Sequence, residues 1–404
     1  MEEIVIFAIP IFTVLMALEF AYGWIAKRNT YSLTDTLSNL SQGLLSRLSQ
    51  FVNQFFHIGI YTLLYHWLWS DYENPFWYSG WGIATGLIVF DFCDYWFHRT
   101  EHESAIFWAS HVIHHQSKHY NLSVALRQVS TEPIFGFVFY LPLALLGMPP
   151  QQLLLTVLIV LFYQFWVHTE HIKKLGWFDY VFDSPSNHRV HHAINPQYLD
   201  KNYGGFLMVW DHLFGTYEPE VEPCVYGTKK PFDSVDPVWT ILNEYVSLFK
   251  VVAQAKGIRN KFRSIYKAPG WTPDQLEQDH LNAEVASKDA LLLKASATSI
   301  NSAPIESKLG YKFQNKLETE SEPFWTKTLI SVCLVQFFSV VAFSIVFLAN
   351  EDTTGYTQAL PTIGAIVGLC WGLGALMGRS INYLQLLVIN LVCYLVLYIK
   401  LTPL

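Results

Sequence analysis

The sequence predicts an all-α protein: a multi-pass integral membrane helical bundle with a histidine-rich di-metal cap on its cytoplasmic face. Composition gives the first indication, because 51% of the 404 residues are hydrophobic and only 15% are charged, against about 25% charged residues in soluble domains. Apolar runs of about 20 residues, long enough to cross a bilayer, recur along the chain. Ten of the fifteen histidines fall in four short clusters close to these runs.

Apolar runs place the helices of the bundle. The expected membrane segments are, in order, residues 4–25, 51–69, 77–97, a helical hairpin at about 133–167, and 328–349, 359–377 and 381–399. The third segment continues without a break into the first histidine cluster. The hairpin folds at a Gly-Met-Pro-Pro turn that begins at Gly147, since glycine and proline end helices. With the hairpin crossing twice, the bundle has eight passes.

Basic residues near the segment ends predict the orientation, because cytoplasmic loops are enriched in lysine and arginine. One face is expected to hold Lys27, Arg28, Arg47, Arg99, Lys173, Lys174 and Arg379. The acidic turns at residues 71–73 and 351–352 then lie on the other face. Eight passes with both termini on the non-cytoplasmic side satisfy this pattern, and every histidine cluster then lies on the cytoplasmic face.

Four regions follow from the apolar runs and the histidines. They are N-terminal transmembrane helices at 1–97, a histidine-rich catalytic core with its hairpin at 98–220, a cytoplasmic segment and linker at 221–322, and a three-helix membrane region at 323–404. The net charge of −7 argues against a nucleic-acid partner. The five cysteines are scattered without a CxxC pair, so we expect free thiols.

The spacing of the histidine clusters predicts a metal centre. The clusters read HRTEH, HVIHH, HTEH and HRVHH. Residues three and four apart share a helix face, so we expect each cluster to aim its imidazoles at one point. The predicted metal ligands are His98, His102, His111, His114, His115, His168, His188, His191 and His192, whereas the role of His171 stays open. The remaining histidines (His57, His66, His119, His212 and His280) are interpreted as surface or core residues.

The number and type of ligands indicate the metal. A single tetrahedral zinc takes four ligands at most, whereas eight or nine imidazoles suit two ions that share a bridging oxygen. Imidazole suits iron, zinc, copper and nickel. We favour two iron ions with O2, because apolar helices beside the site give a lipid access; zinc would indicate hydrolysis instead. Groups expected to orient the ligands are Asp94, Glu101, Glu103, Glu170, Asn187, Asp200 and Asp211.

The order HxxxH, HxxHH and a distant HxxHH among apolar runs resembles the membrane fatty acid hydroxylase and sterol desaturase superfamily. The resemblance covers about residues 91–218. Within the superfamily it is closest to the alkylglycerol monooxygenases, on the segments YNLSVALRQ, FYQFWVHTE, SPSNHRVHHAINPQYLDKNYGG and WDHLFGTYEPE. The nine predicted ligands match the histidines of that family.

The resemblance implies chemistry and location. It implies a di-iron enzyme that uses O2 and tetrahydrobiopterin, or another electron donor such as a redox protein, to hydroxylate the carbon next to an ether oxygen of a lipid substrate. The product then collapses to a fatty aldehyde and a glycerol lipid. Glu103 matches the family's acidic residue after the second histidine, and together with Asp94 it is the predicted catalytic pair. The expected location is the endoplasmic reticulum in a eukaryote or the inner membrane in a bacterium.

Residues near the clusters are expected to bind the lipid. The residues predicted to line the binding path of the alkyl chain are Tyr163, Phe165 and Trp166. The polar head is predicted to be held by Arg127, Lys201 and Asn202.

Other functions remain open at the level of the sequence. A fatty acid, sterol or carotenoid hydroxylase or desaturase would share the fold and ligands, and would need an external electron donor because no fused cytochrome motif is present. A metal transporter or sensor is disfavoured, because its histidines would lie midway through the spans. A scaffold that has lost catalysis is disfavoured by the complete ligand set.

Overall fold

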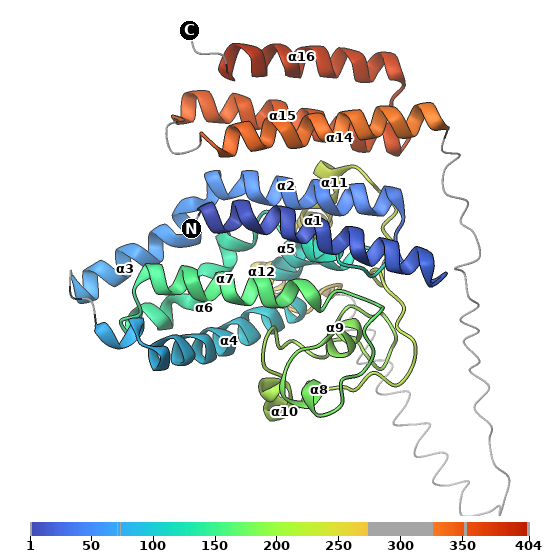
Figure 1. Ribbon diagram of the computed structural model, residues 1–404. Coiled ribbons are helices and arrows are strands. Elements are labelled where there is room, and N and C mark those ends of the chain that lie inside the picture. The colour runs from blue at the N-terminus through green and yellow to red at the C-terminus, as the bar shows by residue number, and fades with distance from the viewer. Residues whose placement is uncertain (1, 71, 73, 274–325, 351–353, 402–404) are drawn as a thin grey trace, which may run out of the picture.

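The structure is a computed structural model that describes residues 2–401 except 71, 73, 274–325 and 351–353. Regular structure in these residues is helical throughout (Figure 1). Apart from the helices there are two isolated bridges, which join Phe182 to Leu207 and Ala193 to Tyr226. The all-α prediction is therefore confirmed for the described residues. The predicted linker at about 282–322 lies outside them.

The N-terminal region contains a helix that the apolar pattern did not reveal. After α1 (Glu2–Ile25), α2 (Leu33–Gln54) continues through a π-helical turn (Phe55–Gly59) into α3 (Ile60–Trp69). The segment expected at 51–69 is thus only the second half of one long helical run. The side chains of α2 are largely polar, and they are buried because they bond to the backbone of other segments: Gln42 donates to Pro237 O at 3.0 Å and Ser46 to Val129 O at 2.8 Å.

The middle of the chain follows the prediction closely. Helix α4 (Gly80–Glu103) runs without a break from the apolar segment into the first histidine cluster, and α5 (Ala105–His115) ends with the second. Helices α6 (Glu132–Leu145) and α7 (Pro150–Trp166) form the predicted hairpin. Its turn needs a glycine, since Gly147 has φ +81° and a Cβ there would lie 3.0 Å from the Trp69 ring. Short helices follow: α8 (Trp177–Val181), α9 (Pro185–His191) and α10 (Val209–Phe214).

The chain closes with a helical pair and a three-helix layer. The pair is α11 (Pro237–Gln254) and α12 (Ile258–Tyr266). The layer consists of α14 (Lys327–Leu348), α15 (Tyr356–Met377) and α16 (Tyr383–Leu401). Helices α14 and α15 lie beside α2, and α16 lies on their far side (Figure 1). Each member of the layer is long and apolar enough to cross a membrane, whereas the apolar helices Pro10–Ile25, α6 and α7 are shorter. The chain is an integral membrane protein by this criterion, and the count of eight passes and the orientation stay predictions.

Two apolar clusters flank the polar centre of the molecule. One lies between α3, α4, α6 and α7 around Tyr61, Phe90 and Leu143. The other joins α2 to the C-terminal layer around Leu48, Val340 and Leu369. The histidines lie between these clusters, where the ends of α4, α5, α7 and α9 meet.

Candidate metal centre

The nine predicted histidine ligands meet in two adjacent groups. The first group is His98, His102, His111, His115 and His191, and the second is His114, His168, His188 and His192. Within each group the ring nitrogens lie within 4.8 Å of one another. Seven of the nine side chains are buried and those of His98 and His114 are half-buried, although they come from four separate chain segments. Every predicted ligand therefore belongs to one of two groups of metal-binding size.

Each HxxHH cluster divides between the two groups, contrary to the expectation that a cluster aims at one point. In α5, His111 and His115 enter the first group while His114 enters the second; in α9, His188 and His192 enter the second while His191 enters the first. Helix geometry explains the split. With about 3.6 residues per turn, residues i and i+4 diverge by about 40°, whereas i+3 and i+4 diverge by about 100° and serve different points.

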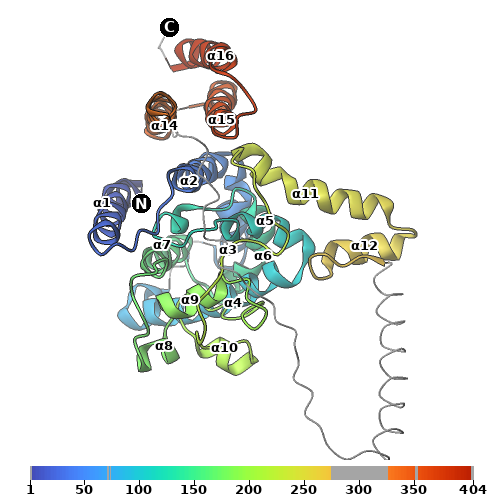
Figure 2. The same ribbon diagram turned by 90° about the vertical axis from the view of Figure 1, so that its right-hand side faces the viewer.

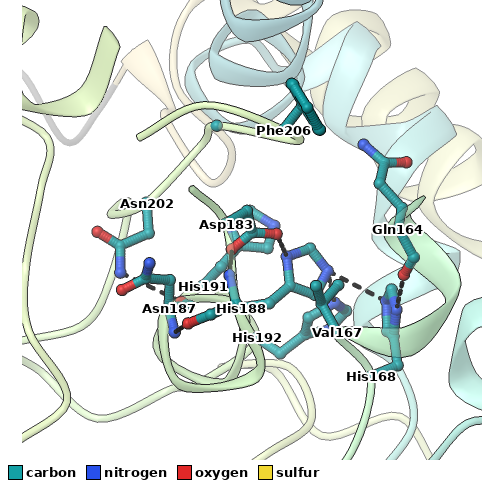
Figure 3. Close-up of polar contacts among 12 residues, drawn as sticks. Gln164, Val167, His168, Asp183, Asn187, His188, His191, His192, Asn202 and Phe206 are labelled. Carbon is teal, nitrogen blue, oxygen red and sulfur yellow. Dashed lines mark hydrogen bonds and ion pairs between the residues drawn. The ribbon is translucent and has the colours of Figure 1, made fainter. Parts of the chain in front are cut away.

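The Nδ1 atoms of the histidines are held by acceptors outside the groups. Backbone carbonyls accept hydrogen bonds from Nδ1 of four of them: Tyr203 O from His98 (2.8 Å), Arg127 O from His114 (3.2 Å), Gln164 O from His168 (2.8 Å) and Lys201 O from His191 (3.2 Å). Two carboxylates take the same position, with Glu101 3.1 Å from His111 Nδ1 and Asp183 3.2 Å from His188 Nδ1. Figure 3 shows Asp183 and Gln164 on the outer sides of the His188 and His168 rings. These contacts fix each ring with Nε2 pointing inward.

The inward Nε2 atoms are arranged for metal binding. His111 Nε2 lies 3.2 Å from His98 Nε2 and 3.1 Å from His115 Nε2. In the second group His188 Nε2 is 3.1 Å from His168 Nε2 and 3.2 Å from His192 Nε2 (Figure 3). Two nitrogens each about 2.0–2.1 Å from one ion would be about 2.9–3.4 Å apart. The observed separations fall in this interval.

The protons on the rings argue for a cation between the nitrogens. A neutral imidazole carries one N–H, and where Nδ1 donates that proton outward, Nε2 presents a lone pair. Facing lone pairs at 3 Å repel one another unless a positive ion separates them. Moreover, His102 Nε2 and His191 Nε2 are buried and have no hydrogen-bond partner among the described residues. Such orphaned acceptors fit the binding of metal ions.

Burial keeps these histidines neutral, as metal ligands must be. It lowers the pKa of His111 and of His114 to about 3, from an ordinary value of about 6.5. The pKa values of His188, His191 and His192 are lowered well below the ordinary value for the same reason. At neutral pH the groups therefore present uncharged imidazoles without competition from protons.

Comparison with known proteins places this centre in a family. Residues 83–216, which contain all nine histidines, match the fatty acid hydroxylase family model. These residues form a fatty acid hydroxylase domain. The resemblance to the hydroxylase and desaturase superfamily is thereby confirmed.

The relatives of this hydroxylase domain act on lipids according to their names. The chain is 39% identical to alkylglycerol monooxygenase from Danio rerio over 271 residues and 40% identical to that from Homo sapiens over 269 residues. Each match covers 66% of this chain and 59% of the relative. An ornithine lipid hydroxylase from Rhizobium tropici is 30% identical over 165 residues, or 38% of this chain and 48% of that protein. The chain thus spans less than two thirds of these relatives, and no solved structure matches it.

The residues predicted to orient the ligands have varied places in the hydroxylase domain. Glu101 contacts a ligand as expected, and Asp200 lies 3.8 Å from His102 Nδ1. The others serve the framework: Glu170 accepts from Tyr226, Asp211 from the backbone of Tyr203 and Gly204, and Asn187 donates to Asp179 O and Phe182 O. Asp183 was missed, because it lies outside the clusters and reaches His188 only through the fold. The backbone carbonyls likewise leave no trace in the sequence.

The two carboxylates predicted to be catalytic lie on opposite sides of the centre. Glu103 pairs with Arg99 at 2.9 Å and its side chain is 52% exposed. Asp94 is half-buried, accepts a hydrogen bond from Tyr140 at 2.7 Å and borders a small cavity. Neither is among the groups that contact Nδ1 of a ligand. Their catalytic roles stay predictions.

His171, whose role the sequence left open, and Glu19 form part of the protein scaffold. His171 stands outside both imidazole groups, and its ring contacts Tyr22 of α1. Glu19 is buried near the end of α1, where its carboxylate accepts hydrogen bonds from Tyr31, Thr169 and the backbone N–H of Leu122, the last at 2.8 Å. Glu19 therefore attaches α1 to the two loops that precede and follow the hairpin α6–α7.

Two cavities reach the histidines. The smaller, about 280 Å³, touches His98, His111, His114, His168 and His188. Its walls are apolar, from α1, α4 and α7, and its polar residues are Asp94, Glu101, Gln128, Glu132 and Gln164. The larger, about 950 Å³, touches His102, His115, His191 and His192 and is bordered by many charged side chains, among them Glu103, Asp200 and Lys229. The hydroxylase domain thus has an apolar and a polar approach to its centre.

The residues predicted to contact the lipid differ in where the fold places them. Phe165 lines the smaller cavity. Arg127 is wrong as a headgroup ligand, because its buried guanidinium already donates to Ile113 O, Ser38, Asn39 and Gln116. Asn202 is wrong for the same reason: it is buried and donates to Asn187 O and Glu218 O (Figure 3). Both residues brace the site.

Proposed function

We propose that this protein is a membrane-bound di-iron monooxygenase that hydroxylates the ether-adjacent carbon of alkylglycerols, giving a fatty aldehyde and a glycerol lipid. One observation carries the proposal: nine neutral imidazoles present inward Nε2 atoms in two groups, beside an apolar cavity. The similarity to alkylglycerol monooxygenases at 39–40% identity supports the substrate class. Lipid oxidation by a metal-dependent hydroxylase fits the two histidine groups, the apolar cavity and the similarity to these relatives.

The two histidine groups would each hold one iron ion. An all-imidazole set adds no negative charge, and the groups of five and four ligands are of a size that suits one ion each. Bound iron would supply the activation of O2. Glu101 and Asp183 lie 3.1 and 3.2 Å from Nδ1 of His111 and His188, and a carboxylate in this position would orient the ring and raise its basicity as a ligand. The resemblance to the alkylglycerol monooxygenases implies tetrahydrobiopterin as the electron donor.

The smaller cavity would bind the substrate. Phe12, Leu158, Leu161, Phe162 and Phe165 supply an apolar wall for the alkyl chain. In an alkylglycerol, the ether-adjacent carbon is only a few bonds from the glycerol hydroxyls, so those hydroxyls must also lie near the histidines. Asp94, Gln128, Glu132 and Gln164 line the same cavity and can accept their hydrogen bonds. This arrangement would place the ether-adjacent carbon at the metal-binding face.

The test uses the purified full chain reconstituted in lipid. The protein is loaded with ferrous iron and incubated with O2, tetrahydrobiopterin and a 1-O-alkylglycerol, and fatty aldehyde is measured together with iron content. We expect two irons per chain and aldehyde formation that requires both O2 and the pterin. Absence of iron binding would refute the metal centre. Iron binding without aldehyde would refute the substrate.

A second function is supported by the more distant relatives. The ornithine lipid hydroxylase and a Delta(7)-sterol 5(6)-desaturase from Aspergillus fumigatus are 30% and 25% identical to the chain, and each match covers 38% of it. Under this alternative the centre hydroxylates or desaturates a fatty acyl, sterol or carotenoid carbon with electrons from a redox protein. Iron-loaded protein would then oxidise such a lipid when a reducing protein system replaces the pterin, and alkylglycerol would be untouched.

A further inference from the structure

The helical pair α11–α12, which we call the basic hairpin (residues 237–267), has a charge unlike that of the rest of the chain. From residue 245 to residue 273 there is no aspartate or glutamate, and there are six cations: Lys250, Lys256, Arg259, Lys261, Arg263 and Lys267. The whole chain has a net charge of −7. A cluster of cations on an otherwise acidic protein indicates a surface that binds a negatively charged partner.

The same hairpin exposes large apolar side chains. Phe249 near the end of α11 is 72% exposed, and Ile258 at the start of α12 is 70% exposed. Phe262 and Tyr266 are 61% and 55% exposed. In α12 the residues Ile258, Phe262 and Tyr266 are four apart and so share one face, and Arg259 and Lys261 stand beside that face. Apolar and cationic side chains therefore form one surface, which is the composition of helices that lie in a membrane interface.

The orientation of the hairpin agrees with this composition. Figure 2 shows α14, α15 and α16 nearly end-on, whereas α11 and α12 lie across the view. Because α14–α16 are the helices fit to cross a membrane, the hairpin lies roughly in the plane of that membrane. Helix α11 also packs against α15 of the crossing layer and against α5 of the metal centre. The hairpin is thus attached, through α11, to both the crossing layer and the metal centre.

We propose that the basic hairpin docks on the surface of an anionic lipid bilayer, with Phe249, Ile258, Phe262 and Tyr266 in the interface and the six cations among the headgroups. Bulky apolar side chains are stabilised when they insert below the headgroups. The aliphatic stems of lysine and arginine let their charged ends reach back to the phosphates. An acidic soluble protein would pair with the cations. It would not explain why an exposed aromatic and aliphatic face lies in the membrane plane. The proposal is independent of the reaction catalysed.

The first experiment locates the hairpin in the membrane. The full chain carrying Phe262→Cys and Cys224→Ser, labelled at residue 262 with an environment-sensitive fluorophore, is reconstituted in phosphatidylcholine alone or mixed with phosphatidylserine. In the mixed bilayer we expect blue-shifted emission and quenching by nitroxide lipids. In the neutral bilayer, and at high salt, the label should be quenched by aqueous iodide instead. Equal iodide quenching in both bilayers would overturn the proposal.

The second experiment tests the charges with a matched pair of variants. Lys256→Glu/Arg259→Glu reverses two exposed cations, and Lys256→Arg/Arg259→Lys keeps both charges. Each cation near an anionic surface strengthens binding roughly fivefold, so reversal should weaken docking at least roughly 30-fold while the charge-conserving variant docks normally. Iron content equal to that of the parent chain shows that both variants fold. Docking that survives charge reversal would overturn the proposal. So would protection of the label from iodide that appears only when an acidic protein is added.

Discussion

The histidine centre and the C-terminal layer are held together by different interactions. Around the histidines, buried polar groups bond to groups far away in sequence. Asn39 donates to Ser123 Oγ, and Asp91 accepts from the backbone of Phe206 and Leu207 and from the Trp210 indole. In α14–α16 the contacts are mostly apolar, and outward residues such as Val335 and Leu391 are exposed. The centre therefore depends on individual partners, whereas the layer depends on apolar surface that many residues can supply.

This difference sets an expected order of mutational effects. An unpaired buried polar group costs more than the hydrogen bond it has lost, so single changes near the histidines should be severe. Interhelical contacts between apolar spans are individually weak, so changes in the layer should be mild. Four sets of substitutions test this order.

The largest effect is expected from removing a ligand. His111→Ala and His188→Ala each delete one inward Nε2 from a group and leave the facing nitrogens unbalanced. Iron affinity should fall by more than about 100-fold, beyond the loss for an orienting residue, and activity should fall to background. Iron content by elemental analysis is the measurement, with exposed His66→Ala as the control. Full iron content in either variant would contradict the assignment of these ligands.

A smaller effect is expected when an orienting carboxylate is neutralised. Asp183→Asn keeps the shape of the side chain but removes the charge that faces His188 Nδ1. Iron affinity should fall by about 10–100-fold while the protein stays folded. Competition with a chelator gives the affinity. Glu222→Gln, which changes a surface carboxylate bonded to Gln197, should bind iron like the parent chain.

A loss of stability is expected when α1 is detached from the hydroxylase domain. Glu19→Gln places an amide donor opposite the three donors that the carboxylate satisfies. The free energy of unfolding should fall by about 1–3 kcal/mol, the cost of an unsatisfied buried group. Tyr31→Phe removes only one of the three bonds and should cost about 1 kcal/mol. Thermal unfolding in lipid measures the loss of stability in both variants. Equal losses for Glu19→Gln and Tyr31→Phe would argue against a Glu19 carboxylate that serves three donors.

The smallest effect is expected in the C-terminal layer. Gln336 and Asn390 exchange hydrogen bonds of 2.7 and 2.9 Å between α14 and α16. Gln336→Leu should cost about 0.6 kcal/mol, the mean for polar contacts between spans, and should leave iron content unchanged. A loss of iron in this variant would show that the layer supports the centre more directly than its apolar packing indicates.

The two regions also differ in how far the sequence predicts them. The layer was predicted to within three residues at each end, for example 328–349 against Lys327–Leu348, because length and hydropathy alone define such helices. All nine histidines that were predicted as ligands fall in one of the two groups, and their role as ligands stays a prediction. Their division into groups was missed, because it depends on how α5 and α9 face one another.

Polar helices and distant partners were the other failures. Helix α2 carries serine, asparagine and glutamine at positions that the fold buries, so no apolar run marks it. Asp183 and the carbonyls of Tyr203 and Gln164 become ligand partners only in three dimensions. Arg127 looks like a surface cation, yet four acceptors occupy its guanidinium. Spacing predicts residues that share a helix face, but it does not predict partners from other segments.

The division of the HxxHH clusters has a consequence for how the centre fills. His114 and His115 are consecutive, as are His191 and His192, and in each pair the members belong to different groups. Consecutive Cα atoms are about 3.8 Å apart, so each pair is a short rigid link between the two proposed iron sites. An ion bound in one group orders the backbone that carries a ligand of the other group. The loss of conformational entropy is therefore incurred by the first ion and not again by the second. Iron should therefore enter metal-free protein cooperatively, with little protein that holds a single ion.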